Sequence, residues 1–283
     1  MNILTFDIED WYNCDFVSGN LEWDKYEVRI YEGVDRILSE LEKRNQKGTF
    51  FCLGWIAEKH PEVIRAIHKN GHHIGCHSYQ HELSFNLDKE NFRKDTLKAK
   101  LLIEDVIGQE INAFRAPGFS IMRNNKWALR VLAEIGFQYD CSIFPAVHDY
   151  GGMCSYGEGI PKRIDVGDGY FIKEFPINIR HVMGKNIVFS GGGFFRLFPF
   201  WLINYWIKSS DYVMTYFHPR DFDTGQPVLN YLPISRKFKS YVGIKKAFFK
   251  LQSLLNNHEF YSIEQVDKVI HWEYTDLINL REL

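Results

Sequence analysis

The chain has 283 residues, of which 45% are hydrophobic, and a formal net charge of −2 at pH 7. The hydrophobic share is ordinary for a globular protein with a real core. A charge this close to zero argues against nucleic-acid binding and against bulk electrostatic attachment to a membrane. The length suits an α/β barrel, which typically needs roughly 250 residues. With no repeat or linker visible, we predict a single domain over residues 1–283.

Cysteine usage and the N-terminus bear on the compartment. An odd and dispersed set of cysteines favours a reducing environment over a disulfide framework. The N-terminus enters a strand-like run, 2–6, without the basic and apolar regions of a signal peptide, so we expect a cytoplasmic protein. No run approaches the roughly 20 apolar residues of a membrane span. The aromatic stretch 194–207 reads as a half-buried helix, with peripheral contact to lipid as the minor alternative. The cysteines are Cys14, Cys52, Cys76, Cys141 and Cys154.

Short apolar strands alternate with amphipathic helices along the first half of the chain. Such alternation predicts βαβ units and therefore a parallel sheet or barrel. After residue 144 the pattern loosens into glycine-rich loops before strands and helices resume. The predicted strands are 3–6, 48–53, 73–76, 111–114, 137–139, 170–175, 186–189, 212–217 and 259–262. The predicted helices are 33–41, 61–70, 87–107, 124–135, 198–207, 243–255 and 263–270.

Polar side chains follow five of these strands. Functional residues of a parallel barrel gather where its strands end, so we expect these side chains to form one site. The sets that follow the strands are Asp7, Glu9 and Asp10; His77 and His81; Arg115 to Gly118; Asp140 to Ser142; and His218 to Asp221.

Histidine pairs four residues apart can share one face of a helical turn and bind one metal ion. Three such pairs occur between residues 68 and 81, so spacing alone is weak evidence. Gly71 interrupts His68/His72, and His73 lies in a predicted strand. His77/His81 is the pair that begins where a strand ends, which makes it the candidate for metal binding.

Two imidazoles and one carboxylate form a common catalytic zinc set that leaves positions open for water and substrate. A second carboxylate nearby can act as the general base on that water, and a third histidine as the general acid. An arginine such as Arg115 can pair with a carboxylate and keep it ionised. For Arg115 a structural salt bridge, and for Asp140 a turn or cap, are the competing interpretations.

The ordered motifs resemble the polysaccharide deacetylase (NodB-homology) family, carbohydrate esterase family four. Within it, the chain resembles most the branch associated with bacterial exopolysaccharide and O-antigen biosynthesis, for which Gly191–Arg196 looks characteristic. The resemblance covers roughly residues 1 to 220. It rests on Thr5-Phe6-Asp7-Ile8-Glu9-Asp10-Trp11, His77-Ser78-Tyr79-Gln80-His81, Arg115-Ala116-Pro117-Gly118, Asp140-Cys141-Ser142-Ile143-Phe144-Pro145 and Tyr216-Phe217-His218-Pro219.

The resemblance implies a distorted (β/α) barrel with about seven parallel strands. It also implies a divalent metal, usually Zn²⁺, and hydrolysis of an N-acetyl group on an amino sugar. The expected substrate is an N-acetylated glycan or a lipid-linked oligosaccharide. The roles carried over are general base for Asp7, metal ligands for His77 and His81, and general acid for His218. Asp140 would orient and charge His218, Arg115 would tether Asp7, and a backbone N–H near Gly118 would help to stabilise the oxyanion.

This sequence departs from the family pattern at the first motif. The common motif has adjacent aspartates, whereas Ile8 follows Asp7 here. If the strand continues, alternation places Asp7 and Glu9 on the same side. A turn directly after Asp7 would select Asp10 instead, and we take Asp10 as the third ligand with Glu9 as the alternative. In the third motif Gly118 stands where an aromatic residue is common, and Phe119 follows it.

Two other functions compete with the deacetylase. One is hydrolysis of another amide, such as a formamido sugar or a small cyclic amide. The other is a catalytically silent sugar-binding barrel, which would require a broken metal set. The sequence leaves open the sugar, its chain length, any lipid carrier and the oligomeric state.

Overall fold

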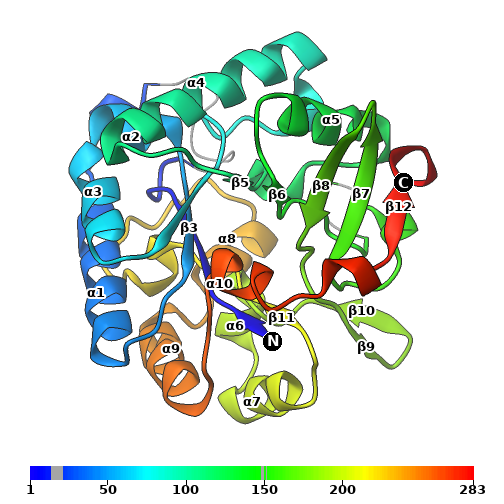
Figure 1. The fold of residues 1–283 in the computed structure, drawn as a ribbon. Helices are drawn as coiled ribbons and strands as arrows, with labels where there is room; N and C mark the ends of the chain where they lie inside the picture. Colours follow the sequence, from blue (N-terminus) through cyan, green and yellow to red (C-terminus); the bar gives the residue numbers. More distant parts are fainter. Residues whose placement is uncertain (14–21, 148–149, 151) are drawn as a thin grey trace.

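A mainly parallel β-sheet with strands from most parts of the chain forms the centre of the fold (Figure 1). The computed structural model describes residues 1–13, 22–147, 150 and 152–283, so Cys14 lies outside the described residues. The strand order in the large sheet is β12-β7-β8-β6-β5-β4-β3-β2. Its strands are β2 (Thr5–Ile8), β3 (Thr49–Cys52), β4 (His73–Cys76), β5 (Ala113–Phe114), β6 (Tyr139–Asp140), β7 (Lys162–Gly167), β8 (Tyr170–Glu174) and β12 (Leu277–Asn279).

The pairs from β2 through β6 to β8 are all parallel, whereas β7 runs antiparallel to β8. On the other side of β2, the short strands β1 (Asn2–Ile3) and β11 (Val213–Met214) pair in parallel, and Phe6 bridges Phe217. The parallel α/β architecture is therefore confirmed. Among the described residues, no continuous ladder links β8 back to β11, so the barrel is not closed by strand pairing.

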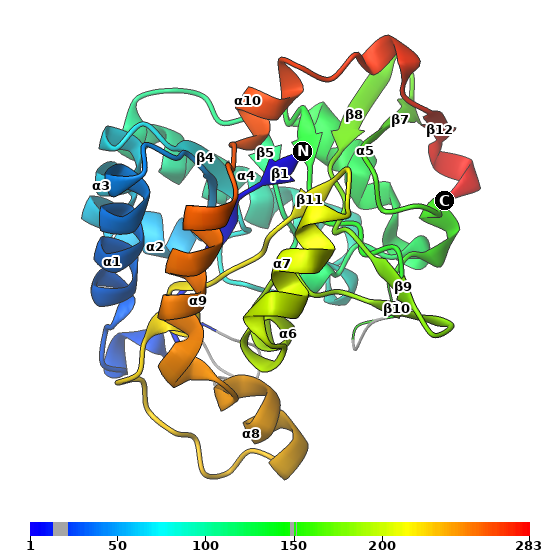
Figure 2. The same ribbon diagram turned by 90° about the horizontal axis from the view of Figure 1, so that it is seen from below.

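Helices surround the sheet, and the two views show them on several sides of it (Figures 1 and 2). In Figure 2, α6 lies between α7 and α8 with α9 beside them, and α10 lies at the opposite end of the view. The helices are α1 (Ile30–Lys43), α2 (Gly54–Lys59), α3 (Pro61–Lys69), α4 (Lys89–Ile107), α5 (Trp127–Glu134), α6 (Gly192–Leu197), α7 (Phe200–Lys208), α8 (Ile234–Tyr241), α9 (Ile244–Asn257) and α10 (Ile263–Asp267).

Local signals in the sequence explain several of these boundaries. Asp88 caps α4 by accepting a hydrogen bond from the Asn91 backbone N–H at 2.8 Å, as expected for an N-cap aspartate. Pro61 occupies the first position of α3, where its missing N–H costs nothing. The predicted strand 73–76 coincides with β4.

Other predictions were less accurate. The predicted strand 259–262 reduces to one bridge between Tyr261 and Ile3. The helix expected over 194–207 is two helices, α6 and α7, and α6 begins in the glycine run at Gly192. Helix α8 was not predicted, because it buries none of its residues. None of the described helices is long and apolar enough to cross a membrane.

Both faces of the central strands are buried, as expected for parallel strands covered by helices. All four residues of β2 and all four of β3 are buried. The rings of Phe6 and Phe50 stack across this pair with their centroids 4.8 Å apart. This packing fixes the end of β2, from which the first acidic residues of the predicted site project.

Candidate metal and catalytic site

One cleft collects the side chains that the sequence placed after separate strands. It lies at the carboxyl ends of β2 and β4 and beside the segment after β11. Helices α6 and α8 form its opposite wall. The residues that line it include Asp7, Glu9, His77, His81, Gly118, Phe119, Tyr150, Gly192, Gly193, Arg196, Tyr216, His218, Arg220, Asp221, Arg236, Lys239 and Ser240.

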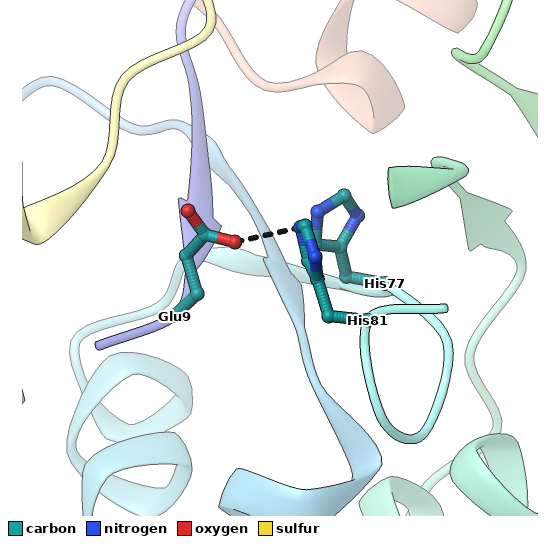
Figure 3. A group of neighbouring side chains, drawn as sticks. All are labelled: Glu9, His77 and His81. Carbon is teal, nitrogen blue, oxygen red and sulfur yellow. Dashed lines mark ion pairs between the residues drawn. The ribbon is translucent and has the colours of Figure 1, made fainter. Parts of the chain in front are cut away.

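Glu9, His77 and His81 form a group that could hold a metal ion. One ligand atom from each lies within 4.8 Å of the others, and all three side chains are buried. Figure 3 shows the Glu9 carboxylate pointing toward the His81 ring, with the His77 ring alongside. Glu9 Oε2 lies 2.8 Å from His81 Nε2. One carboxylate and two imidazoles are a donor set that Zn²⁺ favours, so the residues present fit this metal.

His77 is held in the protonation state that a metal ligand requires. Its Nδ1 lies 2.8 Å from the Arg115 carbonyl oxygen. Because a carbonyl only accepts, Nδ1 carries the hydrogen and Nε2 carries the lone pair. Burial, more than the neighbouring His81, lowers the pKa of His77 to about 4, so the ring is neutral at pH 7.

The two histidines meet through a loop, and the helical turn suggested by their spacing is not formed. Ser78 and His81 both adopt the left-handed region, with φ of 67° and 57°. The Ser78 hydroxyl accepts a hydrogen bond from the His81 N–H at 3.1 Å. Tyr79 N–H donates to Asp95 on α4 at 2.9 Å, which ties the loop to the helix.

The choice of Asp10 as the third ligand needs correction, because the structure brings Glu9 to the histidines. Strand β2 ends at Ile8, and the Glu9 N–H donates to the Asp7 carbonyl oxygen at 3.1 Å, so the chain turns here and both carboxylates line the cleft. The Asp10 carboxylate instead accepts backbone hydrogen bonds from Trp11, Arg29 and Ile30 at 2.7, 2.7 and 2.9 Å. It thereby satisfies N–H groups at the start of α1. Burial raises the pKa of Asp10 to about 6 against these hydrogen bonds.

Glu9 is held as a carboxylate. Burial by itself would raise the pKa of Glu9, but the adjacent His81, with His218 and Arg220 further away, holds it well below its usual range. The Glu9 Oε1 atom lies 3.7 Å from His218 Nε2 and 3.7 Å from Arg220 Nε. Glu9 therefore joins the histidine pair to the side of the cleft that carries His218.

Asp7 is tethered by Arg115, as predicted. Arg115 Nη1 donates to Asp7 Oδ1 and to the Thr5 hydroxyl, both at 2.7 Å. The second carboxylate oxygen, Oδ2, lies 3.8 Å from His218 Nε2. Asp7 thus presents one oxygen to a fixed cation and the other to the cleft.

His218 has a carboxylate partner, but it is Asp221 and not the predicted Asp140. His218 Nδ1 lies 3.0 Å from Asp221 Oδ2, and the His218 backbone N–H donates to the same oxygen at 2.9 Å. Burial alone would lower the pKa of His218, but Asp221, followed by Glu9 and Asp7, raises it. Arg196 Nε lies 3.5 Å from the other Asp221 oxygen. With these cations, Asp221 keeps a depressed pKa despite its burial.

Asp140 supports the Arg115 loop instead. Its carboxylate accepts from the Ser142 hydroxyl at 2.6 Å and from the Ser142 N–H at 3.2 Å. The Ser142 hydroxyl oxygen in turn accepts from the Ala116 N–H at 2.8 Å. Asp140 also hydrogen-bonds Glu174, its register partner on β8. Asp140 therefore fixes the backbone that follows Arg115.

Sequence reasoning named Asp221 as a residue that follows a strand but gave it no role. The available signal was its position three residues after His218, where a carboxylate can reach back to the N-cap residue of a helical turn. The structure forms that arrangement at the start of the 3₁₀ helix Pro219–Phe222.

The wall opposite the metal group depends on the glycine run 191–193. A Cβ on Gly191 would lie 2.1 Å from the Tyr216 carbonyl oxygen, so no larger residue fits here. This close approach brings α6 against the segment that carries His218. Arg196 of α6 then donates to the carbonyl oxygens of Ser240 and Lys239 at 2.7 and 2.8 Å, which holds α8 at the cleft.

Family models match both halves of the chain. Residues 4–139 match the family model for polysaccharide deacetylase, and residues 141–268 match a domain of unknown function (DUF3473). The first half of the chain is therefore similar to polysaccharide deacetylases, in agreement with the motifs found there. These matches do not distinguish the exopolysaccharide branch, and the single-domain assignment stays a prediction.

Two curated relatives carry deacetylase names. The chain is 34% identical over 98 residues to a peptidoglycan-N-acetylglucosamine deacetylase of Bacillus cereus, which covers 34% of this chain and 36% of that protein. It is 30% identical over 140 residues to a peptidoglycan deacetylase of Helicobacter pylori, covering 49% and 42%. The chain thus spans less than half the length of these relatives.

Solved structures confirm the fold. A Mycobacterium smegmatis protein with a provisional assignment as a polysaccharide deacetylase superimposes with a TM-score of 0.66 at 21% identity, covering 98% of this chain and 92% of that one. A family-four pseudoenzyme from Bacillus anthracis superimposes with a TM-score of 0.51 at 14% identity, covering 94% and 64%. The fold alone therefore does not establish activity, which depends on the side chains of the cleft.

The two candidate acids can be separated by metal affinity. We expect Glu9→Ala to weaken Zn²⁺ binding roughly 100-fold or more, because a ligand is lost. Asp10→Asn should leave the affinity within about threefold but lower the melting temperature, because it weakens the hydrogen bonds at the start of α1. Competition with a chromophoric chelator measures both affinities. The opposite pattern would restore Asp10 as the ligand.

The buried carboxyl pair Asp140–Glu174 predicts a pH-dependent stability. Burial, then the neighbouring Asp140, raises the pKa of Glu174 well above its usual range. A carboxyl with a raised folded pKa stabilises fully below its unfolded pKa, about 4.3. That contribution is lost as the pH rises toward the folded pKa. Glu174→Gln, which keeps a hydrogen-bonding amide without the charge, should therefore become more stable relative to the wild type as the pH rises.

Urea unfolding from about pH 5 to about pH 8 tests this, with an expected gain on the order of 1 kcal/mol per pH unit over part of the range. The exposed Glu158→Gln controls for the loss of one surface carboxylate. A difference between Glu174→Gln and wild type that stays constant over this range contradicts the interpretation.

Proposed function

We propose that this protein is a metal-dependent deacetylase that hydrolyses the N-acetyl group of an amino sugar and releases acetate. The observation that carries the proposal is the single cleft in which a metal-binding group, a tethered carboxylate and a carboxylate-paired histidine face one another. Relatives named as N-acetylglucosamine deacetylases support this activity. The family matches support a hydrolase, and the dependence on zinc is part of our proposal.

Glu9, His77 and His81 would hold the divalent metal, with Zn²⁺ as the first candidate. When bound, such an ion lowers the pKa of water and polarises a carbonyl oxygen. The neutral His77 and the ionised Glu9 are in the protonation states that metal binding requires.

Asp7 and His218 divide the proton transfers. Asp7 Oδ2 faces the cleft while Arg115 holds the other oxygen, so Asp7 accepts the proton of the attacking water. The water oxygen adds to the acetyl carbonyl carbon, and the C–N bond then breaks. His218 Nε2 donates a proton to the departing nitrogen, and Asp221 stabilises the imidazolium from the other side of the ring. The products are acetate and the free amino sugar.

The cleft has aromatic side chains suited to a sugar. Phe119, Tyr150 and Tyr216 line it beside the catalytic groups. Aromatic rings present an apolar face, against which the apolar face of a pyranose ring can pack. Phe119 is the pocket aromatic nearest in sequence to the third motif, where Gly118 replaces the usual aromatic residue.

We extend the proposal to the class of substrate. We propose an N-acetylated glycan or a lipid-linked polysaccharide precursor, handled in the cytoplasm during exopolysaccharide or O-antigen synthesis. The support is the Gly191–Arg196 segment, which forms part of the cleft wall, and the dispersed cysteines, which suit a reducing compartment.

The activity can be tested directly. The purified chain with Zn²⁺ should release acetate from N-acetylated oligosaccharides. Asp7→Asn and His218→Gln should each reduce the rate roughly 10²–10⁴-fold while the protein still binds zinc. His77→Ala should lose both properties.

Other products would identify the competing functions. Zinc binding without turnover of any N-acyl sugar would identify a sugar-binding barrel. Release of formate or ammonia in place of acetate would identify another amidohydrolase.

The role of Asp221 predicts a shift in the pH profile. His218 must be protonated to act as the acid, so kcat/KM falls as the pH rises through the pKa of His218. Since Asp221 raises that pKa, Asp221→Asn should move the alkaline limb to lower pH by about one unit. Asp140→Asn is the matched control and should leave the limb in place, because Asp140 bonds Ser142 and not His218. The assignment fails if the Asp140 variant shifts the limb and the Asp221 variant does not.

A further inference from the structure

Helix α8 has two faces with different chemistry. Arg236, Lys239 and Ser240, three and four residues apart, line the cleft. Ile234 and Phe238, also four residues apart, lie on the opposite face and are 89% and 56% exposed. None of the residues of α8 is buried. Its apolar face is therefore not part of the protein core.

Neighbouring helices also expose apolar side chains. Helix α6 contacts α8, and α7 follows α6 directly (Figure 2). Phe194 and Leu197 of α6 are 45% and 47% exposed, and Trp201 of α7 is 70% exposed. We define these residues as the docking ridge: Phe194, Leu197, Trp201, Ile234 and Phe238.

The ridge lies within the most basic part of the chain. Segments 191–210 and 224–258 contain eight Lys or Arg residues and no Asp or Glu, whereas the whole chain has a net charge of −2. Among the described basic residues, Lys208, Lys239, Lys245 and Lys246 are exposed. Exposed apolar side chains and exposed lysines in the same segments match a surface that offers negative charge above an apolar layer.

We propose that the docking ridge binds the surface of an anionic lipid bilayer. Such a bilayer can bind both the lysines and the apolar side chains. Its headgroups neutralise the lysines, and its acyl region accepts Trp201, Ile234 and Phe238. A second copy of this chain would have to bring acidic groups to the four exposed lysines of these segments, which contain no Asp or Glu. The charge pattern therefore favours lipid over self-association.

The position of the ridge relates it to the catalytic cleft. Helices α6 and α8 form the cleft wall with one face and the ridge with the other. A bilayer bound at the ridge would lie beside the cleft and could present a sugar attached to a lipid. This consequence for the substrate rests on the proposed deacetylase function, whereas binding to the bilayer does not.

Vesicle flotation with the whole chain tests the proposal without metal or substrate. The probe is vesicles of equal parts phosphatidylglycerol and phosphatidylcholine, compared with vesicles of phosphatidylcholine alone. We expect binding to the anionic vesicles that weakens as salt is added. The double variant Ile234→Glu/Phe238→Glu should bind roughly tenfold or more weakly. It should still hydrolyse a water-soluble oligosaccharide at the wild-type rate, so failure of the deacetylase and failure of docking give separate results.

The matched control is Val269→Glu/Tyr274→Glu, which adds the same charge at exposed residues of the segment that follows α10. Figure 2 shows α10 at the opposite end of the view from α8. The control should bind vesicles like the wild type. The proposal is overturned if the wild type does not bind anionic vesicles, or if the control loses binding as the ridge variant does. A concentration-dependent dimer in analytical ultracentrifugation that the ridge variant abolishes would also overturn it, in favour of a second copy.

Discussion

The buried ion pair between Arg115 and Asp7 is the interaction on which the rest of the site depends. Arg115 is wholly inaccessible, and its guanidinium donates to Asp7, to the Thr5 hydroxyl and to the Cys141 carbonyl oxygen. Its own carbonyl oxygen accepts from His77 Nδ1. One residue therefore fixes both the proposed base and the tautomer of a proposed metal ligand. Removing one partner of such a pair typically costs about 3–5 kcal/mol, because the other charge stays buried and uncompensated.

Arg115 therefore has two effects: it holds the strands together, and it positions the proposed catalytic groups. A buried ion pair contributes little net stability, since desolvation of both charges offsets their attraction. Its effect is to specify one arrangement of β2, β5 and the segment around Cys141. That arrangement places Asp7 Oδ2 at 3.8 Å and Glu9 Oε1 at 3.7 Å from His218 Nε2. The catalytic geometry thus follows from the packing of strands around one guanidinium.

The sequence predicted the parts of this site that depend on a single strand and its end. The strand 73–76 and the strand-end position of His218 follow from local patterns joined by the parallel-sheet rule, whereas the tether from Arg115 to Asp7 was implied by the family resemblance. It selected Asp10 in place of Glu9, because the path of the chain after β2 depends on contacts with residues far along the sequence. The Asp10 carboxylate accepts hydrogen bonds from the N–H groups of Arg29 and Ile30, about 20 positions further along the chain, and so it is not available to the histidines.

The carboxylate partner of His218 also could not be predicted from the sequence. The family pattern assigned Asp140 to His218, but Asp140 bonds Ser142 and Glu174, while a local carboxylate, Asp221, reaches His218. Asp221 is in turn flanked by Arg196, whose guanidinium also holds α8 through the Ser240 and Lys239 carbonyl oxygens. The charge on the proposed acid and the position of the cleft wall are therefore set by one arginine. Movement of α8 would shift Arg196 relative to Asp221, and it would thereby change the pKa of His218.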